Sequence, residues 1–267
     1  MDRDSIAAIH ARFWRKGWGS VSVEEAGFIL DAVAARRPRR FVEIGTASGL
    51  SGALIRLMLA AHGGERLVTH DVSARFFGDP SRETGFLLGE IGGAEGVSLS
   101  RHVGRGAADL LSRGERFDMA FVDANHRHPW PLLDTLYLSE VLEGSRIAIH
   151  HDLLLHRRGA EPAGIGPKHL FDQAPASRRR AGGGGNIFLL DLSMKRAELG
   201  ALAVSALHLP WSLDRPMGAE AREAARAMLK RSLPGHVLSA FDRAAAKFDR
   251  AAPGWGARGG LLGRFFR

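Results

Sequence analysis

Acidic and histidine side chains recur at points where short apolar stretches of the chain end. Carboxylates placed there can accept hydrogen bonds from ligand hydroxyls or hold a cation, and an imidazole can take up a proton near neutral pH. The side chains are Glu43, Asp71, Asp123, His126, His151 and Asp152. If the apolar stretches are parallel strands, one edge of the sheet gathers their carboxyl ends, where open α/β folds bind ligands. The spacing predicts a single polar site at that edge.

The first of these positions belongs to a short loop, Glu43-Ile44-Gly45-Thr46-Ala47-Ser48-Gly49. A dinucleotide-binding loop needs a second glycine two residues after the first, so that the backbone can approach a pyrophosphate. In this chain that position is Ala47. An acid before the glycine turn is unfavourable beside a pyrophosphate but suits a cationic, amine-bearing ligand. The loop therefore favours a cationic ligand over NAD.

Strands and helices alternate over the part of the chain that carries these residues. β-Branched and aromatic runs predict the strands, and apolar residues at helical spacing predict the helices. The predicted strands are 41–44, 67–71, 97–103, 117–122, 147–149 and 187–190, and the helices between the first five are 50–61, 82–91, 107–111 and 132–142. We predict a Rossmann-like α/β fold, a doubly wound and mostly parallel sheet of about seven strands with helices on both faces.

Helical appendages are expected at both ends of this fold. Ser22 and Glu25 have the spacing of a capping box and predict a helix that runs to about residue 35. Two amphipathic helices are expected at 219–231 and 236–249, and the basic, glycine-rich segment 178–185 is interpreted as a mobile solvated loop. The predicted organisation is an N-terminal helical cap at 1–38, a ligand-binding α/β domain at 39–208 and a basic helical extension at 209–267.

Three segments of the chain resemble one known family. The first is Glu43 to Gly49, which is similar to the motif E-I-G-T-x-x-G; the second is Phe121-Val122-Asp123-Ala124-Asn125-His126 followed by Asp134; the third is the apolar stretch that ends in His150-His151-Asp152. Together they resemble the class I S-adenosylmethionine-dependent methyltransferases, within them the small O-methyltransferase-like group, over residues 20–192. Ala124 departs from the pattern, which often has glycine there.

The resemblance implies a cofactor site, residue by residue. Its members would be Glu43, Gly45, Thr46, Ala47 and Ser48 at the methionine part of S-adenosylmethionine, Asp71 at both ribose hydroxyls, Gly106 and Ala107 at the adenine, and Asp123 near the sulfonium or at a metal. The carboxylate of Asp71 suits two hydroxyl donors because it has two acceptor oxygens.

Methyl transfer to an oxygen also requires that the acceptor hydroxyl lose its proton, and the sequence offers two ways. His126 and His151 are candidate catalytic bases. Alternatively Asp123 and Asp152 are candidate ligands of a divalent cation such as Mg²⁺, which would lower the pKa of the hydroxyl. The sequence leaves both routes open.

The composition bounds the partners. The 267 residues carry a formal net charge of +8 and no cysteine, which excludes disulfides and thiolate metal sites and is compatible with the cytoplasm. No export signal or membrane-spanning apolar stretch is visible, so a soluble cytoplasmic protein is expected. The basic excess suggests nucleic acid, but an N-P-P-Y or D-P-P-Y tetrad is absent and a general use of arginine in place of lysine is the favoured account of the charge, so nucleic acid is not expected as a partner.

These observations favour a methyltransferase that acts on a hydroxyl of a small molecule or saccharide, with a homo-oligomer left open. Two other functions remain as alternatives. One is an NAD- or nucleotide-sugar-binding Rossmann enzyme, against which the missing second glycine argues. The other is a catalytically inactive methyltransferase fold that serves as a binding module, against which Glu43, Asp71 and Asp123 argue because they would be retained without use.

Overall fold

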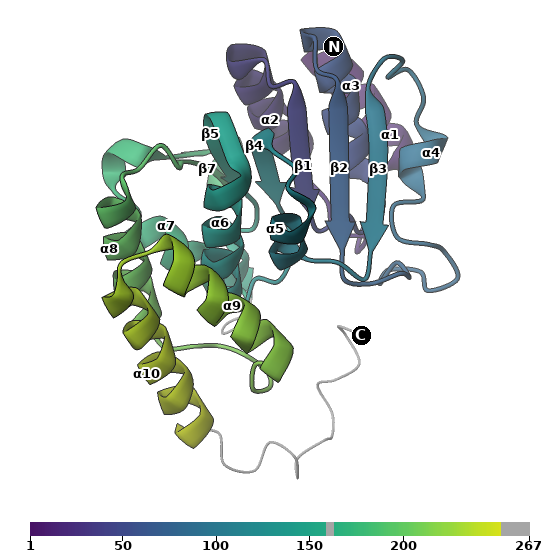
Figure 1. The fold of residues 1–267 in the computed structure, drawn as a ribbon. Coiled ribbons are helices and arrows are strands. Elements are labelled where there is room, and N and C mark those ends of the chain that lie inside the picture. Colours follow the sequence, from purple (N-terminus) through teal and green to yellow (C-terminus); the bar gives the residue numbers. More distant parts are fainter. Residues whose placement is uncertain (159–162, 252–267) are drawn as a thin grey trace.

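The computed structural model of this chain describes residues 1–158 and 163–251 (Figure 1). One seven-stranded sheet runs through the described residues in the order β3-β2-β1-β4-β5-β7-β6. The strands are β1 (Arg40–Ile44), β2 (Arg66–Asp71), β3 (Ser98–Val103), β4 (Phe117–Val122), β5 (Leu142–His150), β6 (Arg179–Gly182) and β7 (Ile187–Asp191). Strands β1 to β5 are parallel, whereas β7 runs antiparallel to both of its neighbours. The predicted doubly wound, mostly parallel sheet is confirmed.

The central strands β1, β2 and β4 are buried on both faces, as a parallel sheet requires, whereas the edge strands β3 and β6 are more exposed. Phe41 packs into one hydrophobic cluster, and its neighbours Val42 and Ile44 pack into another, because successive side chains of a strand point to opposite faces. Glu43 shares the face of Phe41, which is the face covered by the first helices. This alternation explains how an acid can stand inside a buried strand and still meet a helix.

Helices cover both faces of the sheet (Figure 1). On the face of Phe41 lie α1 (Arg3–Phe13), α2 (Val23–Arg36), α3 (Leu50–His62) and the short α4 (Leu87–Glu90). On the other face lie α5 (Leu110–Arg113), α6 (Trp130–Val141), α7 (Ile165–Gln173), α8 (Arg196–Leu207), α9 (Ala219–Ser232) and α10 (Gly235–Ala251). The predicted capping box of α2 is present, with Ser22 and Glu25 bonded to each other's backbone amides.

One predicted helix is wrong. Residues 82–91 form a turn-rich segment that ends in the single turn of α4, because their backbone amides bond elsewhere. Gly85 N–H donates to Ala47 O at 2.8 Å and Leu87 N–H donates to Ser48 O at 3.0 Å. The backbone of Gly85 also takes a φ of +77°, which a helix does not allow. This segment is shaped by the loop at 45–49 and not by its own helical spacing.

The interpretation of residues 178–185 as a mobile loop is also wrong. Arg179 to Gly182 form β6, which pairs with β7 through residues 187–190. The partner strand provides the hydrogen bonds that the glycine-rich sequence by itself does not predict. Gly182 lies against the ring of Phe28 in α2, where a Cβ atom would stand 2.0 Å from a ring carbon. Glycine is therefore used here for close packing.

The C-terminal helices share a hydrophobic cluster with the sheet. Met228 of α9 and Phe241 of α10 are buried in the same cluster as Val42 and Val122. Residues 252–267, the end of the predicted basic extension, lie outside the described residues. Among the helices that the structure describes, none is long and apolar enough to cross a membrane.

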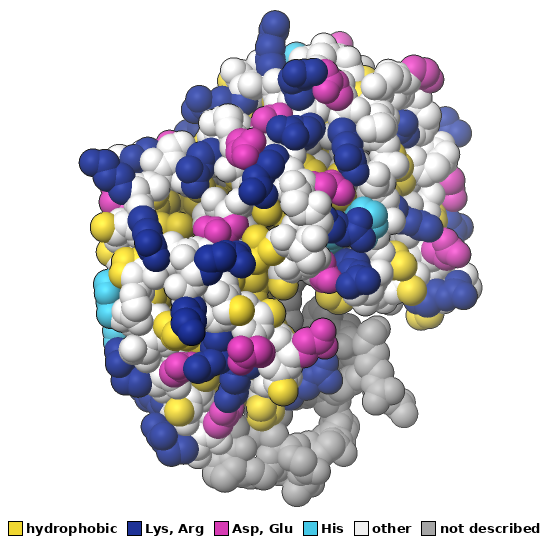
Figure 2. Space-filling model, viewed as in Figure 1, with side chains coloured by type: hydrophobic (Ala, Val, Ile, Leu, Met, Phe, Trp, Pro, Cys, Tyr) yellow, Lys and Arg dark blue, Asp and Glu magenta, His cyan; other side chains and the backbone are white. Residues whose placement is uncertain are grey.

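Charged side chains are interspersed over the face drawn in Figure 2, where Lys and Arg alternate with Asp and Glu. Ion pairs between partly exposed side chains include Arg116 with Glu143 at 3.0 Å and Arg66 with Glu115 at 3.2 Å. Mixed signs weaken the field that would attract a polyanion. The basic excess of the sequence is thus partly neutralised by neighbouring acids on this face.

Candidate active site

The loop that follows β1 is pressed against the end of β4. Gly45 has a φ of +94°, and a Cβ atom there would stand 2.0 Å from the carbonyl oxygen of Asp123. Only glycine combines that backbone conformation with that approach. Ala47 also takes a positive φ, +46°, so the position where a dinucleotide loop has glycine keeps a glycine-like backbone at a cost in strain.

Glu43 is fully buried beneath this loop. Its Oε1 accepts a hydrogen bond from Ser51 Oγ at 2.6 Å, and its Oε2 has no hydrogen-bond partner in the described structure. Burial raises the pKa of Glu43 to about 8, and the nearby Asp123 and Asp71 act in the same direction. An uncompensated carboxyl group at this position favours a cationic ligand nearby.

Asp71, at the end of β2, holds the same loop. Its Oδ2 accepts hydrogen bonds from the amides of Thr46 and Ala47, both at 3.0 Å, and its Oδ1 accepts one from the amide of Ser73 at 2.8 Å. A carboxylate offers about four acceptor positions. Asp71 therefore shapes the loop and keeps some acceptor capacity on Oδ1 for a ligand hydroxyl.

The predicted adenine-binding residues border Asp71. Arg105 N–H donates to Asp71 O at 3.0 Å, which brings Gly106 and Ala107 to the end of β2. Val72, which the sequence analysis did not select, is 78% exposed, and its Cγ1 lies 3.9 Å from where a Cβ of Gly106 would stand. The signal for Val72 is its position directly after the strand-terminal acid. An exposed apolar side chain there provides one wall for a flat, apolar group.

Four predicted residues meet at the ends of β4 and β5. His126 Nε2 lies 3.2 Å from Asp123 Oδ1 and 3.3 Å from Asp152 Oδ2. His151 Nδ1 lies 3.2 Å from Asp123 Oδ1 and 3.5 Å from Asp152 Oδ1. Asp152 takes a φ of +61°, a left-handed conformation that Asp tolerates better than most residues. Both imidazoles thus face the same pair of carboxylates.

The charges of this cluster support one another. Burial by itself would lower the pKa of His151, but the carboxylates of Asp123, Glu25 and Asp152 raise it well above its ordinary value. His126 has its pKa raised in the same way, chiefly by Asp123. The two imidazoles in turn hold the pKa of Asp123 below its usual range in spite of its burial. A positive charge between the two aspartates is strongly favoured, whether a proton or a metal ion supplies it.

Donor atoms of this cluster have the spacing of a cation site. One ligand atom each from Asp123, His126 and Asp152 lies within 4.8 Å of the others. His151 Nδ1 is buried beside them without a hydrogen-bond partner, because its contact with Asp123 is an ion-pair distance without hydrogen-bond geometry. Two carboxylates and an imidazole suit a divalent cation such as Mg²⁺ or Mn²⁺. His126, which the sequence predicted as a base, joins the predicted ligands Asp123 and Asp152.

The loop that carries His126 is fastened from two later segments of the chain. Gly166 N–H, at the start of α7, donates to His126 O at 2.8 Å. Ser212 Oγ accepts from the amide of His128 at 2.8 Å, and Ser212 O accepts from Arg127 Nη1 at 2.8 Å. The position of His126 therefore depends on elements that follow the sheet's fifth strand.

Three neighbouring side chains do not join the cluster. His150 points to the interior, as the alternation of strand side chains predicts, and stacks on Phe188 at a centroid distance of 5.0 Å. His128 is fully buried beside His169. Asp134 is buried in α6, and burial raises its pKa to about 7.

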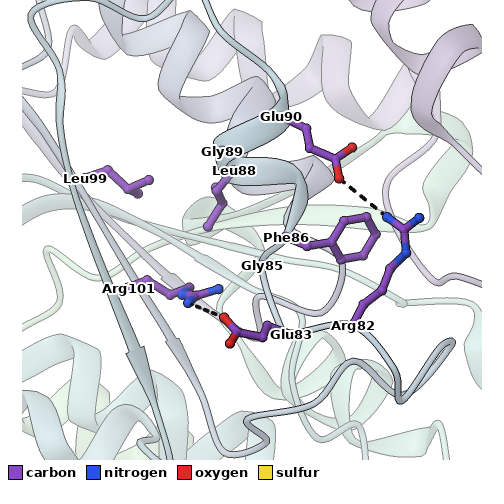
Figure 3. A pocket seen from close by; sticks show the side chains of 9 residues that line it. All are labelled: Arg82, Glu83, Gly85, Phe86, Leu88, Gly89, Glu90, Leu99 and Arg101. Carbon is purple, nitrogen blue, oxygen red and sulfur yellow. Dashed lines mark hydrogen bonds and ion pairs between the residues drawn. The ribbon is translucent and has the colours of Figure 1, made fainter.

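A separate pocket of about 500 Å³ lies between α4 and β3 (Figure 3). Its two arginines are each paired with an acid, Arg82 with Glu90 at 3.5 Å and Arg101 with Glu83 at 2.9 Å. Its lining contains none of the residues predicted for the site. The pocket is thus an open surface hollow on the outer edge of the sheet, apart from the cluster.

Comparison with known proteins points to one domain type. Residues 42–153 match a family model described as a methyltransferase domain. The matched segment contains β1 from Val42 onward and all of β2 to β5, together with Glu43, Asp71, Asp123, His126 and Asp152. No curated protein matches the sequence.

Several solved structures are similar to part of this chain. The O-methyltransferase TomG from Streptomyces achromogenes, involved in tomaymycin synthesis and solved with SAM, is 24% identical with a TM-score of 0.48, over 71% of this chain and 88% of its own. Cofactor-bound Rv0187 from MTB is 18% identical (TM-score 0.48; 72% and 89%), and an O-methyltransferase from Bacillus cereus solved with SAH is 17% identical (TM-score 0.46; 71% and 90%). At these values the likeness carries no inference about activity.

Proposed function

We propose, from the match of residues 42–153 to a methyltransferase domain, that the protein transfers the methyl group of S-adenosylmethionine to a hydroxyl of a small-molecule or saccharide acceptor. One observation carries the proposal. Residues at the ends of strands lie far apart in the sequence but meet at a single edge of the sheet. The loop at 45–49, which favours a cationic ligand, lies at one end of that edge, and the cluster of carboxylates and imidazoles lies at the other.

The residues present fit the cofactor. S-Adenosylmethionine, when bound, supplies an electrophilic methyl group on a sulfonium. Two buried polar groups at the loop, Glu43 Oε2 and the hydroxyl of Thr46, have no hydrogen-bond partner in the described structure. A bound ligand would supply the missing partners. Asp71 would receive a ribose hydroxyl at Oδ1, and Val72 and Gly106 would border the adenine.

The cluster would prepare the acceptor hydroxyl. We assign Asp123, His126 and Asp152 as the residues that would hold a divalent cation, which would lower the pKa of the hydroxyl and help to orient it. His151 Nδ1 is buried 3.2 Å from Asp123 Oδ1, so a proton on this nitrogen would face the same carboxylates as the cation. Because methyl transfer requires in-line approach of the acceptor oxygen, the rigid placement of these side chains contributes to the rate.

Calorimetric titration tests the cofactor. The purified protein, freed of metal with EDTA, is titrated with S-adenosylmethionine, S-adenosylhomocysteine and NAD. We expect saturable binding of the first two and none of NAD. Binding of NAD alone would favour the dinucleotide enzyme, and a folded protein that binds none of the three would refute the proposal.

A second experiment separates the two routes to deprotonation. Mn²⁺ is titrated into the wild-type protein, Asp123→Asn and, as a matched control, Asp31→Asn, whose carboxylate is half-exposed and pairs with Arg3. We expect Asp123→Asn to lower Mn²⁺ affinity at least tenfold and Asp31→Asn to leave it unchanged. Transfer of a labelled methyl group to hydroxyl acceptors in the presence of EDTA would instead favour a histidine base.

A further inference from the structure

Glu25 lies inside the candidate site although it belongs to an N-terminal helix. Its side chain is 7% exposed and faces the end of β5. Its Oε2 lies 3.2 Å from His151 Nε2, and its Oε1 accepts a hydrogen bond from Asn186 Nδ2 at 2.8 Å. Both Glu25 and Asn186 stand outside the segment that matches the methyltransferase domain.

A capping role does not account for this burial. The capping box needs only that the Glu25 carboxylate reach the amide of Ser22, which it also does. A capping carboxylate can do so from the helix surface, exposed to water. Withdrawing a carboxylate from water costs several kcal/mol unless partners compensate for it. The partners here are His151 and Asn186, which together with the Ser22 amide hold the pKa of Glu25 at about 2 in spite of its burial, His151 having the largest effect.

The His151 ring is gripped from both sides. At Nε2 the ring meets Glu25 Oε2 at 3.2 Å and Asn186 Nδ2 at 3.4 Å, while Asp123 and Asp152 face Nδ1 at 3.2 Å and 3.5 Å. Asn186 links the two sides, because its Nδ2 also lies 3.3 Å from Asp152 Oδ1. The ring therefore has one orientation that satisfies all of its charged neighbours.

The backbone around Glu25 leaves its carboxylate little freedom. A Cβ atom at Gly183, in the turn before β7, would stand 2.8 Å from Glu25 Cγ and 2.9 Å from its Cα. Asn186 is fixed in turn, since its Oδ1 accepts from the amide of Leu154 at 3.0 Å and its carbonyl oxygen from that of Leu153. The turn at Gly183 and helix α2 therefore restrict each other's position around the Glu25 carboxylate.

We propose that Glu25 is a positioning residue that holds the His151 ring so that Nδ1 faces the Asp123–Asp152 pair, and that the N-terminal helix thereby completes the active site. This role rests on the proposed function, in which Asp123 and Asp152 hold a cation. The contact between Glu25 and His151 is present whether or not that function is correct. Without Glu25 the ring loses its charged partner at Nε2 and keeps only the amide of Asn186 there, at 3.4 Å, so that it can rotate away from the aspartates. The cation affinity of the cluster then falls, while the cofactor loop at 45–49 is unaffected.

The test compares Glu25→Gln with Glu24→Gln. Glu24 is exposed in the same helical turn, so its substitution makes the same change of charge near the helix N-terminus without touching His151. The ring-nitrogen signals of His151 are recorded by ¹⁵N NMR, and the affinities for Mn²⁺ and S-adenosylhomocysteine by calorimetry. We expect Glu25→Gln to shift the His151 signals and weaken Mn²⁺ binding about tenfold, with S-adenosylhomocysteine affinity within twofold of wild type. Glu24→Gln should change none of these.

A double-mutant comparison shows whether Glu25 acts through His151. In a His151→Asn background, Glu25→Gln should cause no further loss of Mn²⁺ affinity. If Glu25→Gln does not fold, Glu25→Asp replaces it, because the shorter side chain withdraws the carboxylate from His151 Nε2 and should also shift the His151 signals.

The outcomes separate this role from the proposed function. His151 signals identical in wild type and in the folded Glu25 variant would overturn the positioning role, whatever the protein binds. Failure of the wild-type protein to bind S-adenosylhomocysteine would refute the proposed function and leave the NMR comparison intact. A drop in melting temperature with unshifted His151 signals would mean that Glu25 serves stability alone.

Discussion

At the level of single residues, the buried acids of the site have two kinds of environment. Asp123 and Glu25 lie beside imidazoles and stay ionised, whereas Glu43 has only the hydroxyl of Ser51 and prefers its neutral form. Glu43 is neutral without a ligand, and a nearby cation would lower its pKa and ionise it. Such a carboxyl group is suited to recognising an amine-bearing cofactor. Glutamate thus has two roles in this site: Glu25 carries a permanent charge beside His151, and the charge of Glu43 depends on the ligand.

Glu43 should make the unliganded protein less stable as the pH rises. Its pKa is about 8 in the folded state and 4.5 ordinarily, so between these values the folded state keeps a proton that the unfolded state has lost. The free energy of unfolding should therefore fall as the pH rises from about 5 to about 8. Urea denaturation across this range should show a shallower decline for Glu43→Gln than for wild type; identical profiles would contradict the assignment.

The same substitution should weaken cofactor binding. Loss of one charge-assisted contact corresponds to about 10- to 100-fold in affinity. Calorimetry with S-adenosylmethionine at pH 8 measures the effect, and equal affinities of Glu43→Gln and wild type would show that the carboxylate does not face the ligand.

Asp71→Ala should affect both cofactor and loop. It removes the proposed ribose acceptor and also leaves the amides of Thr46 and Ala47 without their partner. We expect S-adenosylhomocysteine affinity to fall at least tenfold and stability to fall by about 1–3 kcal/mol. Calorimetry and thermal unfolding measure the two effects separately, and unchanged affinity would sink the ribose assignment.

At the level of elements, the site depends on how closely the loop at 45–49 approaches β4. The sequence indicates the loop from its glycines, but the approach exists only because β1 and β4 are neighbours in the sheet. The segment after β2 then bonds to the loop through Gly85 and Leu87, which is why the helix predicted at 82–91 does not form.

Gly45→Ala tests the importance of this approach against a matched control. Gly63 also has a positive φ, +80°, but a Cβ there would meet nothing within 4 Å. Gly63→Ala should cost about 1–2 kcal/mol, from backbone strain alone. Gly45→Ala should cost a further ~1–3 kcal/mol, because its methyl group would overlap the Asp123 carbonyl. Equal midpoints in urea would show that β4 moves aside without cost.

At the level of the whole molecule, elements outside the matched segment support the site from both sides. Glu25 comes from α2, while Gly166 and Ser212 hold the loop of His126 from the C-terminal half. The domain organisation proposed from the sequence treats 1–38 and 209–267 as appendages. Their contacts with the site indicate that these appendages also contribute to its geometry.

Phe241→Ala should show that the C-terminal helices contribute to the common core. Phe241 is fully buried in α10, in the cluster that includes Val42 of β1. Its truncation should cost about 3–5 kcal/mol. Phe77→Ala is the control, since Phe77 is 45% exposed and should cost less than about 1 kcal/mol. Urea denaturation followed by strand and helix signals should give one transition; a separate, weaker transition of the helices in Phe241→Ala would contradict a common core.

Local rules made much of this protein predictable from its sequence. The capping box of Ser22 and Glu25, the strand-terminal positions of Asp71 and Asp123, and the opposite directions of His150 and His151 all follow from interactions between near neighbours in the chain. Residues a few positions apart meet by the geometry of their own helix or strand, whatever the rest of the molecule does. The sequence alone therefore determined the five parallel strands, their polar edge and four members of the cluster.

Only the tertiary structure decided how that edge is completed. Glu25 and Asn186 are 161 positions apart, and no local pattern distinguishes the buried Glu25 from an ordinary capping glutamate. Their contact requires that α2 cover one face while β7 inserts antiparallel beside β5. Such a contact forms only when a long stretch of chain closes on itself. A charged group also requires a specific partner only once it is buried away from water, and burial is decided by the whole fold.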